Sequence, residues 1–205
     1  MRPTVEFSRL DLSKTYSYAD YLTWQFPEFG PDYAEIVHGQ VLPQLPGRST
    51  AHQRCLTQLM LPLHEYLRNR PEEMVQIPFD VCPAYQPGQA DEEIDTVVQP
   101  DLIILRDPAT KLRERGCFGP PDWIVEIVSP AFLARDTRLK FDLYQQCGVN
   151  EYWLVYPGLK VAEIWALGRG GRYELAAQAS EPGQAVAPLT LPGLAFEWAA
   201  IFAKD

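Results

Sequence analysis

Two acidic residues lie inside strongly apolar runs of this sequence. Asp101 lies in the run 97–105 and Glu126 in the run 122–129, and both runs have the composition of buried strands. A carboxylate inside a buried strand is costly unless something compensates its charge. Two carboxylates on neighbouring strands would supply the oxygen ligands that Mg²⁺ or Mn²⁺ prefers. The pair therefore predicts a divalent-metal site.

Strand geometry decides whether the two acids can meet. Side chains alternate along a strand, so Asp101 shares a face with Gln99, and Glu126 shares a face with Ile124. If the two strands are adjacent, both acids point into one cleft. The alternative is structural: Asp101 merely follows a turn at Pro100, and Glu126 pairs with a buried arginine.

A third polar feature follows the second acidic strand. Asp136, Lys140 and Tyr144 recur at four-residue steps in an expected helix over 134–147, which ends at Gly148. One interpretation is a solvated face with a weak Asp–Lys ion pair. The other is that Lys140 folds back toward Glu126 and completes a phosphodiester-cleaving site. There it would stabilise developing negative charge or orient an attacking water.

Two further residues are candidates for the same site. Glu35 lies in an expected hairpin over 33–42, whose turn is His38-Gly39, and His52 lies in the first turn of an expected helix over 50–70. Either side chain could be an extra ligand, a proton shuttle or a support for a ligand. For His52 alone, a core or helix-start histidine is the alternative.

The remaining patterns predict one domain over residues 1–205, with a core at about 17–203. We expect an α/β (α+β) fold, a mixed central sheet flanked by helices, with an N-terminal hairpin. A run of Pro, Gly and acidic residues over 83–96 predicts an exposed loop, and Pro62 should kink or restart its helix. The other expected elements are helices over 17–26 and 197–203 and strands over 74–81, 151–156, 160–167, 172–178 and 186–191.

Composition limits the class of protein. The chain has 205 residues, 46% of them hydrophobic, and no apolar stretch approaches the roughly 20 residues needed to cross a bilayer. The N-terminus has no apolar signal sequence. The four cysteines are irregularly spaced, which argues against a zinc site or a disulfide framework and favours a reducing cytoplasm.

The net charge of −9 is unusual for a protein that binds nucleic acid. Its distribution weakens this objection, because residues 1–100 carry 7 basic and 14 acidic side chains whereas residues 101–140 carry 7 and 6. The excess acid is thus concentrated away from the candidate site. The alternative is that it serves only solubility.

Several of these segments, in their order and spacing, resemble the "Uma" family of proteins classed as restriction endonucleases, over about residues 17–203. The segments that carry the resemblance are 33–41, His52-Gln53-Arg54, Gln99-Pro100-Asp101-Leu102, 121–130, the Asp136–Lys140–Tyr144 stripe and 148–155.

The resemblance implies a fold and a site of the PD-(D/E)XK nuclease superfamily, with a curved sheet flanked by helices and a divalent-metal site. Asp101 matches the acid of the Pro-Asp motif and Glu126 the second acid. Val128 stands where the superfamily has lysine, and the family supplies Lys140 from the next helix instead. The further polar positions that it implies are Glu35, His52, Gln99, Ser129, Asp136 and Tyr144.

These observations predict a Mg²⁺-dependent (or Mn²⁺-dependent) DNA endonuclease in which Asp101, Glu126 and the Ile127 carbonyl hold the metal. One alternative is a non-catalytic nucleic-acid-binding or assembly module of the same fold, and another is a hydrolase of a different phosphate ester. We also expect a homodimer, with the aromatic-rich segment 151–165 as a possible interface, although ordinary core packing would explain the same aromatics. We expect no membrane association.

Overall fold

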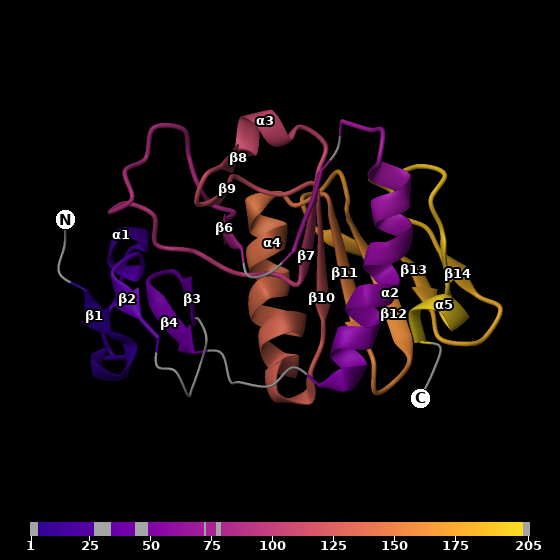
Figure 1. Cartoon of the computed structure of the whole chain (residues 1–205), viewed down its shortest axis with the longest axis horizontal. Coiled ribbons are helices and arrows are strands. Elements are labelled where there is room, and N and C mark those ends of the chain that lie inside the picture. The colour runs from indigo at the N-terminus through magenta and orange to yellow at the C-terminus, as the bar shows by residue number, and fades with distance from the viewer. Residues whose placement is uncertain (1–3, 27–33, 44–48, 72, 77–78, 203–205) are drawn as a thin grey trace.

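A mixed six-stranded sheet forms the centre of the molecule (Figure 1). The computed structural model describes residues 4–26, 34–43, 49–71, 73–76 and 79–202. Neighbouring strands are antiparallel except for the parallel pair β10 and β11. In spatial order the strands are β13 (Tyr173–Ala179), β12 (Val161–Leu167), β11 (Glu151–Tyr156), β10 (Trp123–Ile127), β7 (Leu102–Leu105) and β5 (Glu73–Gln76).

Helices cover both faces of this sheet, with α4 (Phe141–Cys147) on one side and α2 (Thr50–Leu67) on the other (Figure 1). Alternation along β10 decides which side chains meet which helix. Trp123, Val125 and Ile127 pack in the cluster that contains the buried side of α2, whereas Ile124 and Val128 pack in the cluster that contains α4. The sheet therefore has two apolar faces, as the continuous hydrophobic runs predict.

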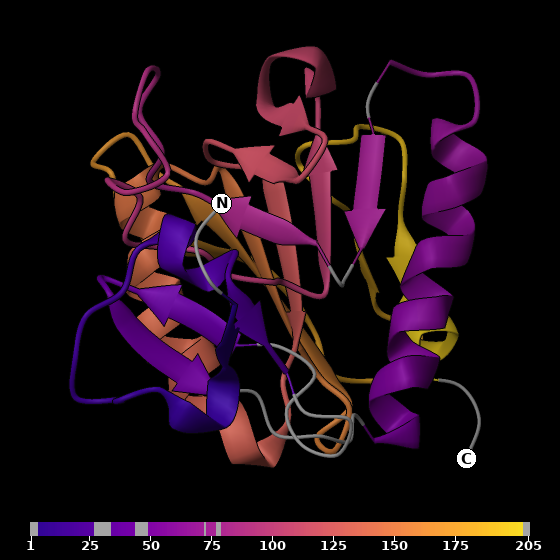
Figure 2. The same ribbon diagram turned by 60° about the vertical axis from the view of Figure 1, so that its left-hand side comes forward.

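The N-terminal part of the chain forms a smaller layer beside α4 (Figure 2). Its aromatic cluster is built on Phe7, Tyr18, Tyr21 and Trp24. A three-stranded sheet, in the order β6-β9-β8, lies close by. These elements are β1 (Val5–Glu6), η1 (Phe7–Arg9), α1 (Tyr18–Tyr21), β2 (Trp24–Gln25), β3 (Ala34–Val37), β4 (Gln40–Pro43), β6 (Asp80–Cys82), α3 (Pro108–Lys111), β8 (Leu112–Arg113) and β9 (Gly116–Phe118).

The C-terminal elements close the core on the side of α2. Strands β14 (Ala185–Val186) and β15 (Phe196–Glu197) pair with each other, and α5 (Trp198–Phe202) packs in the same cluster as α2. The buried carboxylate of Glu151 ties the segment before β15 to the sheet, because it accepts hydrogen bonds from the backbone N–H groups of Leu189 and Thr190.

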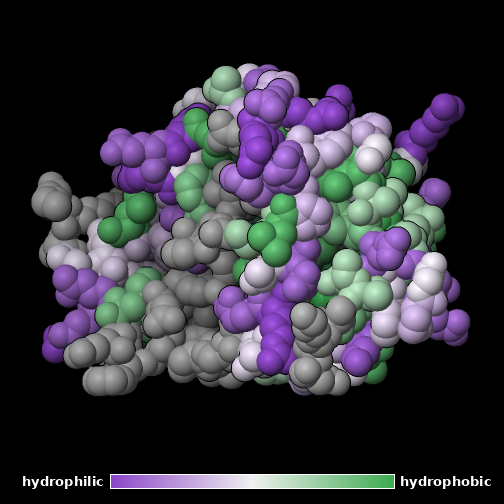
Figure 3. Space-filling view, turned by 45° about the vertical axis from the view of Figure 1, so that its right-hand side comes forward, coloured by the Kyte–Doolittle hydropathy of each residue, from purple (hydrophilic) through white to green (hydrophobic). Residues whose placement is uncertain are grey.

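Helix α2 follows its expected amphipathic pattern. Its N-cap is Ser49, whose hydroxyl accepts a hydrogen bond from the backbone N–H of His52. The helix neither ends nor restarts at Pro62. Its outer side contributes to the largely hydrophilic band that runs from top to bottom through the middle of Figure 3. One large apolar side chain of the helix, Leu61, is exposed.

The β3–β4 hairpin and its turn are confirmed. Val37 pairs with Gln40, and the backbones of His38 and Gly39 both have positive φ angles, 50° and 78°. Positive φ at both central residues is the geometry of a type I′ hairpin turn. Tyr33, which the hairpin was expected to include, lies outside the described residues.

Five expected boundaries are wrong. The helix expected over 50–70 ends at Leu67. The helix expected over 17–26 ends at Tyr21, although its Ser17 capping box is present. The strand expected over 74–81 is two strands, β5 and β6. The strand expected over 97–105 begins only at Leu102, because Pro100 has no N–H group to donate to a ladder. The strand expected over 186–191 comprises only Ala185 and Val186.

The helix expected over 134–147 forms in two parts. After η2 (Pro130–Phe132), a π-helical segment, η3 (Arg135–Lys140), leads directly into α4. Gly148 ends α4 in the left-handed conformation, with φ of 80°, as its C′ position predicts.

The aromatic residues proposed as an interface belong to the core. Tyr152 and Trp153 are buried on opposite faces of β11, so the packing interpretation of segment 151–165 is the correct one for both. The cysteines are free thiols. No helix in the described part of the chain is long and apolar enough to span a membrane.

Candidate active site

The register of β7 against β10 brings the two predicted acids together. Leu102 pairs with Val125 in an antiparallel ladder. Continuing this register by one residue sets Asp101 opposite Glu126. Opposed residues of an antiparallel pair project from the same face, which here is the face covered by α4. The adjacency that the sequence required of these strands is thus confirmed.

Asp101 is fixed by the end of β10 and the start of α2. Its Oδ2 atom accepts a hydrogen bond from the backbone N–H of Ile127, at 2.8 Å. Its Oδ1 atom lies 3.1 Å from Nε2 of His52, an ion-pair distance without hydrogen-bond geometry. Nδ1 of His52 lies 3.1 Å from the carbonyl oxygen of Ile127. Because a carbonyl can only accept, Nδ1 carries a proton in this contact.

Glu126 lies under the helical segment that follows its strand. The ammonium group of Lys140 donates to Oε1 of Glu126 at 2.8 Å, and the hydroxyl of Tyr144 donates to the same atom at 3.0 Å. Glu126 and Lys140 are 5% and 2% exposed. The interpretation of Lys140 as part of a solvated helix face is therefore wrong, and Glu126 pairs with a lysine rather than with an arginine.

The π-helical turn explains how Lys140 reaches Glu126. A π-helix has a wider turn than an α-helix, so it alters which residues face the sheet. Asp136 and Lys140 are both buried in η3, and Tyr144 is buried in α4, so the expected stripe faces inward. The hydroxyl of Tyr152 donates to the backbone carbonyl of Asp136 at 3.0 Å and holds this turn against the sheet.

Glu35 joins the same cluster from the β3–β4 hairpin. Its Oε1 atom lies 2.7 Å from Nζ of Lys140 and accepts a hydrogen bond from the backbone N–H of Gln99 at 2.8 Å. Its Oε2 atom lies 3.8 Å from Nη1 of Arg135. One ammonium group is therefore shared by two buried carboxylates from different parts of the sequence.

The electrostatics of the cluster are dominated by buried negative charge. Glu35, Asp101, Glu126 and Asp136 are all buried. Burial raises the pKa of Glu126 well above its usual value, against the attraction of Lys140, and the nearby acids raise it further. Burial raises the pKa of Asp136 to about 6, again opposed by Lys140 and reinforced by Glu35 and Asp101.

Lys140 is held in its charged form. Burial alone would lower the pKa of its ammonium group, but the carboxylates of Glu126 and Glu35 outweigh this and keep the pKa well above its usual value. Among the described residues, these four carboxylates lie near two cationic side chains, Lys140 and Arg135. This excess of negative charge suits a cation.

The donor set matches the preferences of a hard divalent ion. Asp101, Glu126 and the carbonyl of Ile127 offer oxygen atoms, which Mg²⁺ and Mn²⁺ favour. Both protein donors to Glu126 use Oε1, and its Oε2 atom accepts no hydrogen bond within the described part of the chain. Among the described residues, no three His, Cys, Asp or Glu side chains are grouped closely enough to hold a metal ion by themselves.

Two supporting residues have buried oxygen atoms without a hydrogen-bond donor. They are Oε1 of Gln99 and Oγ of Ser129. Gln99 lies two residues before Asp101, and Ser129 lies two residues after Ile127, so both orphaned acceptors belong to segments that carry the predicted ligands. Buried acceptors usually find a partner, which marks these segments as places where water or a ligand could supply one.

The structure therefore brings the predicted residues into one neighbourhood. Hydrogen bonds and ion pairs join these residues in two neighbouring groups, and Asp136 interacts electrostatically with members of both. One group is Asp101, His52 and Ile127, and the other is Glu35, Gln99, Glu126, Lys140 and Tyr144. No contact from Ser129 to the acids is recorded in the described chain. The four acids and Lys140 are buried, each at most 6% exposed.

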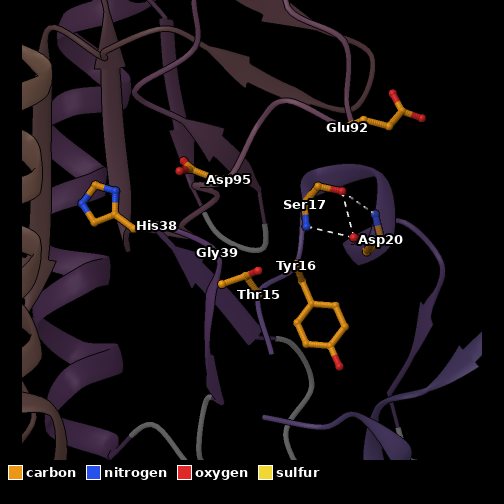
Figure 4. A pocket seen from close by; sticks show the side chains of 8 residues that line it. All are labelled: Thr15, Tyr16, Ser17, Asp20, His38, Gly39, Glu92 and Asp95. Atoms are coloured by element: carbon orange, nitrogen blue, oxygen red, sulfur yellow. Dashed lines mark hydrogen bonds between the residues drawn. The ribbon is translucent and has the colours of Figure 1, made fainter. Parts of the chain in front are cut away.

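A separate cavity of about 540 Å³ lies near the N-terminus (Figure 4). It contains none of the acids described above, and Asp20 on its wall is already engaged in the Ser17 capping box. Its acidic lining therefore gives it no evident chemistry. The cavity is lined by Thr15, Tyr16, Ser17, Asp20, His38, Gly39, Glu92 and Asp95.

Three residues next to the cluster were missed from the sequence. Arg135 approaches Glu35, and Asp80 and Tyr21 both bond to the Gln99 side chain. Asp80 carried a usable signal, because it lies between the apolar residues Phe79 and Val81, just as Asp101 interrupts an apolar run. Arg135 and Tyr21 carried none, since their neighbours in the sequence do not indicate what they contact.

Two comparisons with known proteins, one of sequence and one of structure, found a similarity over most of the chain. Residues 18–200 match the family model described as "Uma2: Putative restriction endonuclease". The chain is also similar to the crystal structure of "a putative nuclease belonging to DUF820" from Anabaena variabilis ATCC 29413. The TM-score is 0.69 at 15% identity, over 91% of this chain and 97% of that chain, a likeness of fold. No curated protein matches the sequence.

Proposed function

Because this chain belongs to the Uma2 family, we propose that it is a divalent-metal-dependent DNA endonuclease. The observation that carries the proposal is the meeting of Asp101, Glu126 and Lys140 from three separate segments. Paired carboxylates and a lysine are the groups needed to cleave a phosphodiester bond with Mg²⁺ or Mn²⁺. The description of the family and the nuclease-like fold favour the same reaction.

The roles of the side chains follow from their contacts. Asp101, Glu126 and the Ile127 carbonyl would hold the ion, and His52 would orient both Asp101 and Ile127. The ion would activate a water molecule and neutralise charge on the scissile phosphate. Gln99 and Tyr144 fix the two acids that share Lys140.

Lys140 would act as a fixed positive charge. Its two carboxylate partners hold the ammonium group in place, so it is better suited to stabilising negative charge on phosphate than to accepting a proton. A preorganised charge of this kind lowers a barrier by about 3 kcal/mol. Glu35 would keep Lys140 in position while Glu126 binds the ion.

A cleavage assay with matched variants tests this proposal. Wild-type protein with Mn²⁺ or Mg²⁺ should cut plasmid DNA, and EDTA should stop the reaction. Lys140→Ala should lose the activity, whereas Lys111→Ala, which removes a lysine paired with Asp122 away from the cluster, should keep it. If the wild type cuts no plasmid, single-stranded DNA or RNA with either ion, the enzyme proposal is wrong. Cleavage of RNA or of a small phosphate ester alone would correct the substrate.

A second function is favoured by the burial of the cluster. Asp101, Glu126 and Lys140 are at most 5% exposed, as in an ion-pair network that only stabilises a fold. The alternative is a non-catalytic module that binds nucleic acid or a protein. Calorimetric titration with Mn²⁺ separates the two functions, because the module predicts no binding, or binding that Asp101→Asn leaves unchanged.

A further inference from the structure

A buried polar cluster on the N-terminal side of the acids contains Asp80, which has no role in the site described above. Its Oδ1 atom accepts hydrogen bonds from Nε2 of Gln99, at 2.8 Å, and from the hydroxyl of Tyr21, at 3.0 Å. Nε2 of Gln99 also donates to the Tyr21 hydroxyl, at 3.0 Å. These three side chains therefore form a closed triangle of hydrogen bonds, which we call the Asp80 triangle.

The triangle is anchored on both sides. Tyr21 belongs to α1, where Tyr18 donates a further hydrogen bond to Oδ2 of Asp80 at 3.1 Å. Asp80 begins β6, which pairs with β9. At Gly116 of β9 an added Cβ atom would lie 2.7 Å from the carbonyl oxygen of Asp80, so the two backbones are in close contact.

Gln99 connects the triangle to the candidate active site. While its side chain bonds to Asp80 and Tyr21, its backbone N–H donates to Oε1 of Glu35, the atom that also lies against Lys140. Gln99 thus links the half-buried carboxylate of Asp80 to the buried carboxylate of Glu35, the first through its side chain and the second through its backbone. Both amide protons of its side chain have acceptors, which fixes the orientation of the amide group.

The position of Gln99 constrains Asp101. Only Pro100 separates them, and the ring of a proline fixes its φ angle. The preceding residues are also held, because Val97 pairs with Ile36 and Val98 pairs with Val81. A displacement of Gln99 would therefore pass directly to Asp101 and to its hydrogen bond with Ile127.

We propose that Tyr21, Asp80 and Gln99 form a positioning unit for the metal ligand Asp101 and for Glu35. The inference deepens the proposed nuclease function and rests on it for its consequence in metal binding. That Gln99 is held in place by Tyr21 and Asp80 rests on the hydrogen bonds alone. Asp80 and Tyr21 act through Gln99 and touch no ligand themselves.

The chain provides a matched pair of variants to test the unit. Tyr21→Phe and Tyr18→Phe each remove one hydroxyl from α1 and one hydrogen bond of nearly equal length to Asp80. Of these two tyrosines, only Tyr21 is hydrogen-bonded to Gln99 within the described part of the chain. A purely structural tie between α1 and β6 predicts equal effects, whereas a positioning unit predicts that only Tyr21→Phe disturbs the site. Asp80→Asn, which replaces the charged acceptor of the Gln99 and Tyr21 hydrogen bonds with a weaker neutral one, should act like Tyr21→Phe.

The first measurement needs no metal. Amide exchange, followed by NMR on the full-length protein in EDTA, should show faster exchange at Ile127 and Gln99 in Tyr21→Phe and Asp80→Asn than in Tyr18→Phe. Both protons are donated to carboxylates of the site. Equal exchange in Tyr21→Phe and Tyr18→Phe would overturn the proposal, since it would show that Gln99 keeps its position without Tyr21.

The second measurement is the Mn²⁺ dissociation constant from calorimetry, on variants whose circular dichroism matches that of the wild type. Loss of a group that orients a metal ligand typically weakens binding about 10–100-fold. We expect about 10-fold for Tyr21→Phe and Asp80→Asn and less than about 2-fold for Tyr18→Phe. If the wild type binds Mn²⁺ and all three variants bind equally well, the positioning unit is wrong. If the wild type does not bind Mn²⁺, the proposed function is wrong, and the exchange data still decide the geometry.

Discussion

Nζ of Lys140 lies 2.8 Å from Oε1 of Glu126, although the two residues are 14 positions apart and belong to a helical segment and a strand. The same nitrogen lies 2.7 Å from Oε1 of Glu35, which comes from the N-terminal hairpin. A single cation therefore joins three segments of the chain.

Replacing Lys140 should destabilise the protein strongly. Lys140→Met would leave Glu35 and Glu126 buried without their shared cation, and breaking a buried ion pair costs about 3–5 kcal/mol. Urea unfolding at pH 8 in EDTA measures the loss. The double variant Glu126→Gln with Lys140→Met removes one of the stranded charges and should recover part of this free energy. A loss below about 1 kcal/mol in the single variant would mean that the buried pair contributes little.

Asp101→Asn should remove metal binding while the fold persists. The asparagine oxygen can still accept the N–H of Ile127, but the side chain no longer carries a negative charge. We expect Mn²⁺ affinity to fall by more than about 100-fold, beyond the effect of losing a group that merely orients a ligand. Calorimetry measures this, with Asp122→Asn as the control because Asp122 pairs with Lys111 outside the cluster. Unchanged binding in Asp101→Asn would exclude Asp101 as a ligand.

Asp136→Asn should stabilise the protein at neutral pH but not at acid pH. The pKa of Asp136 is raised to about 6 in the folded chain, mainly by burial. The folded state therefore binds this proton more tightly than the unfolded state, and the wild type loses stability as the pH rises from about 4 to 6. Asparagine cannot ionise and avoids this loss, which amounts to at most about 3 kcal/mol.

The groups acting on Asp136 are Lys140 and Arg135, which favour its charged form, and Glu35 and Asp101, which oppose it. Urea unfolding of the wild type and the variant in EDTA, at pH 4 and at pH 7, measures the difference. The exposed Asp142→Asn on α4 is the control and should show no such gain with pH. A constant difference between wild type and Asp136→Asn across this range would contradict the assignment.

Glu151→Ala should loosen the C-terminal segment without affecting the site. The Glu151 carboxylate is buried and accepts hydrogen bonds from the indole of Trp153 at 2.6 Å and from the backbones of Leu189 and Thr190. Leaving the buried indole donor of Trp153 unsatisfied costs about 1–3 kcal/mol. We expect a loss of about this size in urea unfolding, faster amide exchange at Leu189 and Thr190, and unchanged Mn²⁺ affinity. Protection of both amides in the variant would show that other contacts hold this segment.

The sequence was enough to predict those parts of the helices and turns that depend only on residues close by in the chain. The start and the buried face of α2, the hairpin turn at His38-Gly39 and the end of α4 at Gly148 all follow from side-chain periodicity or from backbone conformations that nearby residues favour. Boundaries failed where tertiary contacts compete with local preference. Residues 97 and 98 extend the apolar run of β7 but pair instead with Ile36 and Val81.

For the site, the sequence by itself determined which residue types were available and which faces they occupy. An acidic residue inside an apolar run can be recognised in the amino-acid sequence, so Asp101 and Glu126 could be found without a structure. Only the tertiary structure decided that Lys140 is buried between two acids, that η3 is a π-helix, and that Asp80 reaches Gln99. The physical reason is that these contacts join segments far apart in the sequence, and their distances depend on strand order and helix packing rather than on neighbouring residues.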